Sequence, residues 1–309
     1  MIRLLSFFFI FFITILYAVE PIVPIPESIE YKKDKALLGK LLFFDPLLSA
    51  DKKISCASCH DFDYGGADPR DFSIGVYGRK GVVNSPTVLN SVFNFRQFWN
   101  GRAKDLKEQV IEPLFSPVEM GMTKELVEER LNSSKLYKKE FKKVYKTEVI
   151  TLDMVIDAIA EFEKALITPN SKFDRFLKGE IKLSTEEEKG YLLFKQLGCI
   201  TCHNGINLGG NSFQKIGAII PYPRKKSAQD RYEVTKREFD KNRFKVPTLR
   251  NIILTAPYFH DASAKTLYDA IDKMAYHELG VKLTWEEKNF LIAFLATLTG
   301  EKPKILDEK

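Results

Sequence analysis

The chain has few residues of the types that bind metals or form disulfides: its 309 residues include only four cysteines and four histidines. Hydrophobic residues make up 45% and charged residues 28%, proportions that exclude a disordered, collagen-like or coiled-coil chain. The formal charge of +6 is a small excess without a dense basic stripe, so we expect no nucleic-acid partner. The length allows two domains, each large enough to bury a core.

The N-terminus is typical of a signal peptide over residues 1–18. Arg3 precedes an uncharged apolar run over 4–17, and the small residue Ala18 follows it. This run is shorter than the roughly 20 residues that span a bilayer, although an uncleaved membrane anchor remains the alternative. We expect cleavage after Ala18 and export of the remainder, which has no other long apolar stretch.

All four cysteines lie in two copies of the pattern C-x-x-C-H. The first copy is Cys56, Cys59 and His60, and the second is Cys199, Cys202 and His203. In c-type haem attachment, two thiols bond the vinyl groups of one porphyrin and the adjacent histidine binds the iron. A zinc site would need four ligands from one local module, and a C-x-x-C redox pair would leave both histidines unexplained. The sequence therefore predicts two covalently bound haem c groups.

The segments that precede the two motifs are also repeated. GKLLF at 39–43 precedes the first motif and GYLLF at 190–194 precedes the second, each in a helix-like run. We expect a mainly α fold of two cytochrome c-like haem domains with long loops, packed around an inter-domain interface. Capping and periodicity predict helices that begin after Thr151, Ser184 and Thr284, and long loops over 61–86 and 204–247. A break in the helical pattern between 166 and 184 predicts domains at 19–179 and 180–309.

Six motifs follow one another in a characteristic order: LGKLLFFD at 38–45, SCASCH at 55–60, NSPTVLN at 84–90, FWNGR at 98–102, PVEMG at 117–121 and FKVPTLRN at 244–251. In this order the chain resembles the bacterial di-haem cytochrome c peroxidase family, with the methylamine-utilisation di-haem enzymes as a related branch. The resemblance implies a periplasmic enzyme whose first haem reduces hydrogen peroxide to water. Its second haem, of higher potential, would receive electrons from a small donor, a cytochrome c or a copper protein. Family members are often dimers, so a homodimer is expected by analogy.

The resemblance also implies roles for individual residues near the first haem. Glu119 matches the distal glutamate that moves protons on the peroxide, and Gln109 matches its accompanying glutamine. Trp99 matches the tryptophan that lies between the haems. A solvated loop acid is the alternative interpretation of Glu119, and a core aromatic that of Trp99.

Near the second haem, Met274 matches the axial methionine of the peroxidases. His277 is the alternative ligand, and His260 is expected to be a structural or propionate-side histidine. The methylamine-utilisation enzymes carry a tyrosine at this position, and Tyr276 is close in sequence.

A calcium ion bridges the two domains in the family, which implies a site of backbone and amide oxygens around Asn84, Thr255 and Pro257. Oxygen ligands of this kind suit calcium.

One position departs from the peroxidase pattern. The loop SIGVYG at 73–78 has Val76 where many peroxidases have a distal histidine that blocks the first iron until the second haem is reduced. Valine cannot bind iron, and the first half of the chain has no histidine besides His60. We therefore expect a five-coordinate or water-bound first iron that needs no reductive activation, as in the methylamine-utilisation branch. Tyr77 and Met122 are the fallback ligands.

Two other functions compete with the peroxidase. A di-haem electron carrier or sensor would have no turnover, but Glu119, Gln109 and the ligand-free Val76 loop argue against it. A di-haem oxidase that modifies a partner protein is disfavoured by Met274, since the branch with that activity has tyrosine there.

Overall fold

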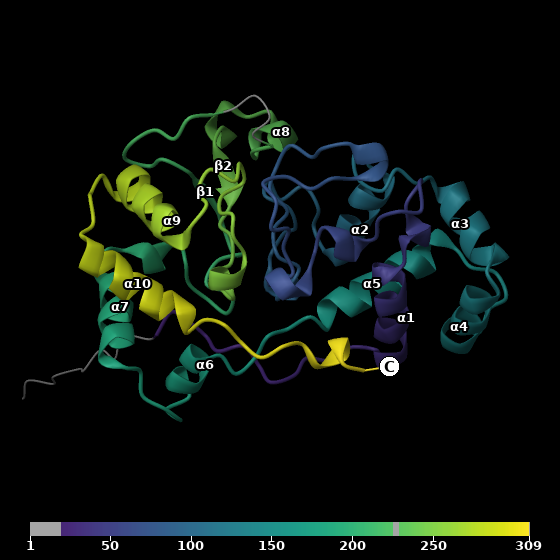
Figure 1. Ribbon diagram of the computed structural model, residues 1–309, viewed down its shortest axis with the longest axis horizontal. Coiled ribbons are helices and arrows are strands. Elements are labelled where there is room, and N and C mark those ends of the chain that lie inside the picture. The colour runs from purple at the N-terminus through teal and green to yellow at the C-terminus, as the bar shows by residue number, and fades with distance from the viewer. Residues whose placement is uncertain (1–19, 225–228, 309) are drawn as a thin grey trace, which may run out of the picture.

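The computed structural model describes residues 20–224 and 229–308, so the predicted signal peptide lies outside the described residues. The described chain is mainly helical, as the sequence predicts, with one small sheet (Figure 1). Its α-helices are α1 (Lys33–Phe44), α2 (Leu106–Phe115), α3 (Lys124–Ser133), α4 (Lys135–Tyr145), α5 (Leu152–Lys164), α6 (Lys172–Leu177), α7 (Thr185–Gln196), α8 (Tyr232–Thr235), α9 (Leu267–Met274) and α10 (Trp285–Ala296).

Two closely packed helix pairs organise the fold, α1 with α5 and α7 with α10. A methyl group at Gly39 of α1 would lie 1.9 Å from the carbonyl oxygen of Ala158 in α5. A methyl group at Gly190 of α7 would lie 1.9 Å from the carbonyl oxygen of Phe290 in α10. Only glycine permits this approach of the two backbones. The repeat at 39–43 and 190–194 thus corresponds to a repeated helix crossing.

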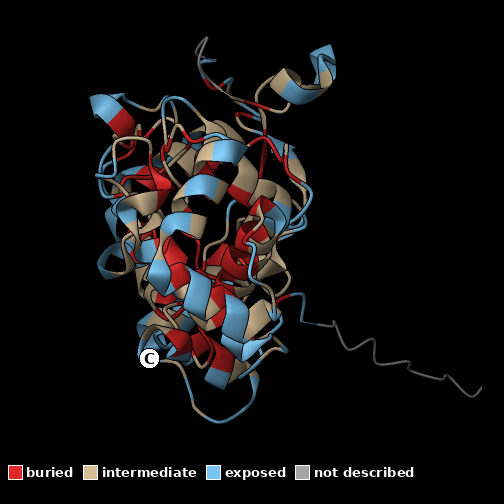
Figure 2. Cartoon of the chain, turned by 90° about the vertical axis from the view of Figure 1, so that its right-hand side faces the viewer, coloured by how far each residue is buried: buried red, intermediate tan, exposed pale blue. Residues whose placement is uncertain are grey.

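Each helix pair has its own hydrophobic core. The first cluster, which defines the first half of the molecule, includes Leu42, Phe43, Val127, Phe141 and Phe162. The second cluster, which defines the second half, includes Phe173, Tyr191, Phe194, Leu291 and Phe294. Fully burying side chains of this size contributes roughly 1.5–3 kcal/mol each. Figure 2 shows the buried residues on the inner faces of the helices.

The two ends of the chain cross between these cores. Ile22, near the N-terminus, packs in the second cluster, and Ile305, near the C-terminus, packs in the first. In Figure 1 the yellow C-terminal segment runs from α10 to end beside α1. The chain ends therefore tie the two halves together.

The predicted helices are present, but two predicted irregular segments contain regular structure. Ser184 and Thr284 cap α7 and α10 through capping boxes with Glu187 and Glu287, as predicted. The region 204–247 is not wholly a loop, because the antiparallel strands β1 (Phe213–Lys215) and β2 (Arg243–Lys245) and helix α8 form within it. Likewise α6 forms between 166 and 184, capped by Ser171. These elements were missed because they are only three to six residues long.

A second repeat joins the halves through Thr168. Asn90 and Asn251 both adopt a left-handed backbone conformation, and both side chains donate to the Thr168 hydroxyl, at 2.7 and 2.9 Å. The residues directly before these asparagines are Leu89 and Arg250. The main-chain N–H of each donates at 3.0 Å to the hydroxyl of the threonine two residues earlier. The segments 84–106 and 245–267 are thus structural counterparts in the two halves.

Within the described residues, no helix combines the length and the apolar character that crossing a membrane requires.

Candidate functional site: two haem motifs and the residues between them

The first C-x-x-C-H motif is held in a short turn after α1. Cys56 begins a 3₁₀ turn that Ser55 and Ser58 cap reciprocally, and the main-chain N–H of His60 donates to the Cys56 carbonyl at 3.0 Å. The His60 ring Nδ1 lies 3.2 Å from the carbonyl oxygen of Gly66. This contact fixes the ring orientation and leaves Nε2 available as a ligand.

The second motif has the same construction. Helix α7 ends before Gly198, whose positive φ of 79° lets the chain turn into the 3₁₀ segment at Cys199. The main-chain N–H of His203 donates to the Cys199 carbonyl at 3.0 Å, and its ring Nδ1 lies 3.2 Å from the Leu208 carbonyl oxygen. Two motifs 143 positions apart in the sequence therefore present their histidines in the same way.

The electrostatics of both motifs suit haem attachment. Burial lowers the pKa of His60, and it lowers that of His203 to about 4, so both rings are neutral at pH 7 as iron coordination requires. None of the four cysteines is paired in a disulfide, so all four are available to bond haem vinyl groups. The donor set thus fits two haem c groups, with His60 and His203 as the histidines that bind the irons.

Glu119 lies on a turn that packs against the first motif. Its neighbour Met120 is buried, with its sulfur 4.0 Å from the Cys56 sulfur. Burial raises the pKa of the Glu119 carboxyl, whereas a hydrogen bond with Ser116 and the charge of Arg102 act in the opposite direction. The turn places an acid with a raised pKa beside the first haem motif.

Helix α2 brings further polar groups to the same region. The side-chain oxygen of Gln109 is buried and has no hydrogen-bond partner among the residues that the structure describes. One turn later Glu112 pairs with Arg102, whose guanidinium lies 3.5 Å from the ring centroid of Phe98. Among the residues that the structure describes, no hydrogen bond joins Gln109 to Glu119, so the two predicted residues are not directly hydrogen-bonded.

The Val76 loop lies directly against the Glu119 turn. The main-chain N–H of Val76 donates to the Glu119 carbonyl at 2.8 Å, and the Val76 side chain is fully buried. Of the two fallback residues, Tyr77 is 64% exposed, and the Met122 sulfur accepts from Arg130 at 3.7 Å within the first core. The open first iron and these fallback ligands stay predictions.

Met274 is the last residue of α9, where the helix changes to a π-helical turn, Ala275–Leu279. Such turns are frequent at functional sites. His277 lies in this turn, with its ring Nδ1 2.9 Å from the Ile220 carbonyl oxygen and its ring 4.9 Å from that of Tyr222. Tyr276 is 43% exposed.

Trp99 lies where the two halves meet. Its indole N–H donates to the Asn84 carbonyl at 2.8 Å, and its ring is 6.2 Å from that of His260 in an edge-on arrangement. Trp99 and His260 are counterparts in the repeated segments, each following a phenylalanine with a positive φ. Both are therefore interface residues, and His260 is buried.

Comparisons with known proteins agree with this arrangement. A sequence profile of the di-haem cytochrome c peroxidase family matches residues 33–182. The chain is 48% identical over 290 residues to the cytochrome c551 peroxidase of Nitrosomonas europaea, covering 94% of this chain and 87% of that protein. The chain belongs to the di-haem cytochrome c peroxidase family. It is accordingly an enzyme, a cytochrome c peroxidase, and membership implies two haem c groups.

Two further proteins, one compared by sequence and one by structure, are similar to this di-haem peroxidase. It is 44% identical over 295 residues to cytochrome c peroxidase Ccp of Escherichia coli, covering 94% of this chain and 63% of that longer protein. The crystal structure of a MauG-like protein associated with microbial copper homeostasis matches with a TM-score of 0.79 and 30% identity, over 93% of this chain and 95% of that one. The mainly helical fold is thus shared with a solved member of the wider group.

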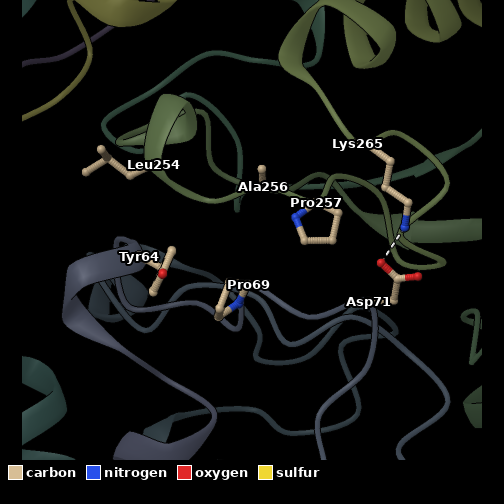
Figure 3. A pocket seen from close by; sticks show the side chains of 7 residues that line it. All are labelled: Tyr64, Pro69, Asp71, Leu254, Ala256, Pro257 and Lys265. Atoms are coloured by element: carbon tan, nitrogen blue, oxygen red, sulfur yellow. Dashed lines mark hydrogen bonds and ion pairs between the residues drawn. The ribbon is translucent and has the colours of Figure 1, made fainter.

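The residues matched to the family's calcium site lie near a pocket of about 260 Å³ between the halves (Figure 3). Pro257 lines this pocket together with Asp71 and Lys265, which form an ion pair. Asn84 donates its side-chain amide to the Asp71 carbonyl at 3.4 Å, and Thr255 donates its hydroxyl to the Ile252 carbonyl at 3.2 Å. Among the described residues, no three His, Cys, Asp or Glu side chains are grouped as a metal site. The expected calcium ligands are backbone and amide oxygens rather than these side chains, so the calcium site stays a prediction.

Three residues of this di-haem peroxidase escaped the sequence reasoning. Met120 was noticed only as part of a motif, although its sulfur contacts Cys56. Glu163 in α5 is 4% exposed, and one of its carboxyl oxygens has no partner among the described residues. Lys245 ends β2 and is 7% exposed. Glu163 follows Ile159 by four residues and Ile156 by seven, so helical periodicity could have indicated its burial. Lys245 lies in a stretch rich in lysine and arginine and carries no such signal.

Proposed function

We propose that this protein reduces hydrogen peroxide to two waters in the periplasm, at a haem attached to Cys56 and Cys59. The reaction consumes two electrons and two protons. We assign the first haem to residues 19–179. We assign a second haem to residues 180–309, where it accepts electrons from a small donor. The haems supply the iron chemistry and hold the electrons, and the protein residues move the protons.

The observation that carries this proposal is the contact between the Glu119 turn and the first motif. Because Met120 touches Cys56, the neighbouring Glu119 carboxyl belongs to the surroundings of the first haem and not of the second. A buried carboxyl with a raised pKa can take a proton from one peroxide oxygen and return it to the other near neutral pH.

Gln109 and Arg102 complete the proposed pocket. The unpartnered Gln109 oxygen can accept a hydrogen bond from peroxide, and Arg102 offers a fixed positive charge beside Glu119. A positive charge favours the carboxylate form of Glu119, which is the form that accepts a proton.

We further propose that the enzyme needs no reductive activation. Val76, anchored to Glu119, cannot bind iron, and the loop is held by a main-chain hydrogen bond. Valine in place of a histidine leaves the peroxide side of the first haem open in the oxidised enzyme.

For the second haem we propose Met274 as the axial ligand opposite His203. A thioether favours ferrous iron and raises the potential, as an electron-accepting centre requires. A redox titration of M274H tests this: we expect the second potential to fall by on the order of 0.1 V or more, within the roughly 0.8 V range that axial ligands span. An unchanged potential would reject the assignment.

We propose a small cytochrome c or copper protein as donor, a homodimer as the assembly, and calcium bound near Asn84, Thr255 and Pro257. Among the described residues of the lysine- and arginine-rich region 224–245, Arg224 pairs with Asp230 and Glu233, Lys236 with Glu233, and Lys241 with Glu238. Because these ion pairs neutralise part of its positive charge, we expect turnover to depend little on salt.

Steady-state peroxide consumption with a reduced donor, started from oxidised and from pre-reduced enzyme, tests the proposed function. We expect equal initial rates from both forms. A lag confined to oxidised enzyme would reject the open first haem, and no consumption from either form would indicate the electron carrier. Turnover only in the presence of a protein substrate would indicate the oxidase.

A further inference from the structure

Lys245 is fixed by its main chain at the meeting of the two halves. It pairs with Phe213 in the β1–β2 hairpin, and its N–H donates to the Trp99 carbonyl at 2.7 Å. The preceding Phe244 stacks on His260, with ring centroids 4.1 Å apart. Lys245 is therefore buried at this junction, with 7% of its surface exposed.

The ammonium of Lys245 has no acceptor in the part of the chain that the structure describes. Among the described residues, no hydrogen bond or ion pair reaches its Nζ, and burial alone lowers its pKa to about 8. A buried cation without a partner is costly, and native proteins pair such groups with an anion. The position thus indicates a negative group that the polypeptide itself does not provide.

The counterpart of Lys245 in the first half behaves differently. Asn84 occupies the equivalent place, since its N–H donates to the His260 carbonyl at 2.9 Å just as that of Lys245 donates to Trp99. The Asn84 side chain is satisfied within the protein, donating to the carbonyls of Arg70 at 3.2 Å and Asp71 at 3.4 Å. Only the second half places a cation here.

The segment that follows Lys245 lies against the second haem motif. Two residues later, the Pro247 carbonyl faces the ring of His203. A methyl group at Gly209 would lie 2.1 Å from that carbonyl oxygen, so the strand lies tightly against the segment that follows His203. A haem held by His203 brings two propionate carboxylates, which are anions of the kind that Lys245 lacks.

We propose that Lys245 is the counter-ion of a propionate of the second haem and that it raises the potential of that haem. This inference rests on the proposed attachment of a haem at Cys199 and Cys202. Reduction of the iron adds one negative charge to the haem, so a nearby ammonium stabilises the reduced form. The same charge keeps the propionate ionised, which makes the potential insensitive to pH.

Spectroelectrochemical titration of the holoenzyme tests the proposal, with K245M as the variant that removes the charge. We expect the equilibrium constant for reduction of the second haem to fall at least tenfold, which is about 59 mV for one electron. The potential of K245M should also fall as pH rises, because the unpaired propionate takes up a proton on reduction. A merely structural role for Lys245 would not produce that slope.

Two matched variants complete the test. K245R keeps the charge and should stay within threefold of the wild type. K215M removes an exposed lysine from the paired strand β1 and should do the same, because a solvated charge is screened. If K245M fails to mature, K245Q against K245R gives the same comparison.

The outcomes separate this inference from the function on which it rests. Fewer than two haem c groups in the mass spectrum of the wild type would overturn both. Two haems with K245M indistinguishable from K215M in potential and pH slope would overturn the inference alone. A fall confined to the first haem would overturn the assignment to the second.

Discussion

The two haem motifs lie in one repeated framework but face different chemistry. In both halves a glycine allows a helix pair to cross closely, a 3₁₀ turn carries the cysteines, and the histidine Nδ1 lies 3.2 Å from a carbonyl oxygen. The differences lie elsewhere: the first half has the Glu119 turn and Val76, and the second has Met274 at the end of α9. We therefore expect haem attachment to be duplicated, and the reactivity of each haem to be set by the segments that differ between the halves.

The same lesson holds for single positions inside the repeat. Leu89 in the first half corresponds to Arg250 in the second, Glu163 to Leu295, and Asn84 to Lys245. Each pair exchanges an apolar or neutral residue for a charged or ionisable one in the same backbone setting. These exchanges can be reversed by mutation, which makes the comparison testable.

The largest expected effect concerns Glu119, the acid on the turn beside the first haem motif. E119Q removes the proton carrier while keeping the shape of the side chain, so we expect kcat to fall by about 10²–10⁴. Steady-state peroxide consumption measures this, with E129Q, at an exposed acid of α3, as the control. Turnover within threefold of the wild type would show that the Glu119 turn does not distinguish the halves.

Replacing Arg250 by leucine, the residue at the equivalent position 89 of the first half, should lower the stability of the second half. Arg250 is fully buried and pairs with buried Asp174 at 2.6 Å, so R250L leaves the carboxylate buried without its cationic partner, although the N–H groups of Ile25 and Ser171 still donate to it. We expect a loss of about 3–5 kcal/mol in the free energy of unfolding, measured in urea. The double variant R250L/D174N should recover part of that loss. A single variant as stable as the wild type would contradict the contribution assigned to this pair.

Glu163 should make stability depend on pH. Burial raises its pKa from 4.5 to about 8, so the folded protein holds a proton that the unfolded chain releases in between. Stability contributed by the protonated acid is present below 4.5 and is lost as pH rises toward 8. E163Q stays neutral, and relative to the wild type it should gain at most about 1.4 kcal/mol per pH unit across this window.

Urea unfolding at pH 4.5, 6 and 8 measures the difference, with D153N, at an exposed acid of the same helix, as the control. A constant difference between E163Q and the wild type over this range would refute the buried neutral acid.

The smallest expected effect concerns Trp99. W99F loses the hydrogen bond to the Asn84 carbonyl, worth about 1 kcal/mol, and should slow reoxidation of the second haem by peroxide. Stopped-flow absorbance at the two haems measures the rate. W285F replaces the only other tryptophan, which is 73% exposed, and should leave stability and rate unchanged. Equal behaviour of the two variants would remove Trp99 from the electron path.

Local patterns in the sequence predicted α1, α5, α7, α10 and both haem motifs, because helical periodicity, capping and C-x-x-C-H spacing act over a few residues; α2, α3, α4 and α9 were not predicted. The place of Glu119 needed the family resemblance, since a glutamate in a Pro-rich turn has no signal of burial. The Lys245 to Trp99 contact could not be predicted, because it joins segments 146 positions apart through the packing of both halves. The short elements β1, β2 and α6 were missed for the same reason, as tertiary contacts stabilise them.

The central claim is that both haem motifs share one framework and that only the first haem can react with an external ligand. The spectrum of the fully oxidised protein, recorded with and without cyanide, tests this claim most directly. We predict two haem c groups per chain, a second haem that stays low-spin, and a first haem that is high-spin and converts to low-spin on binding one cyanide. Two low-spin haems that leave cyanide unbound would contradict the account.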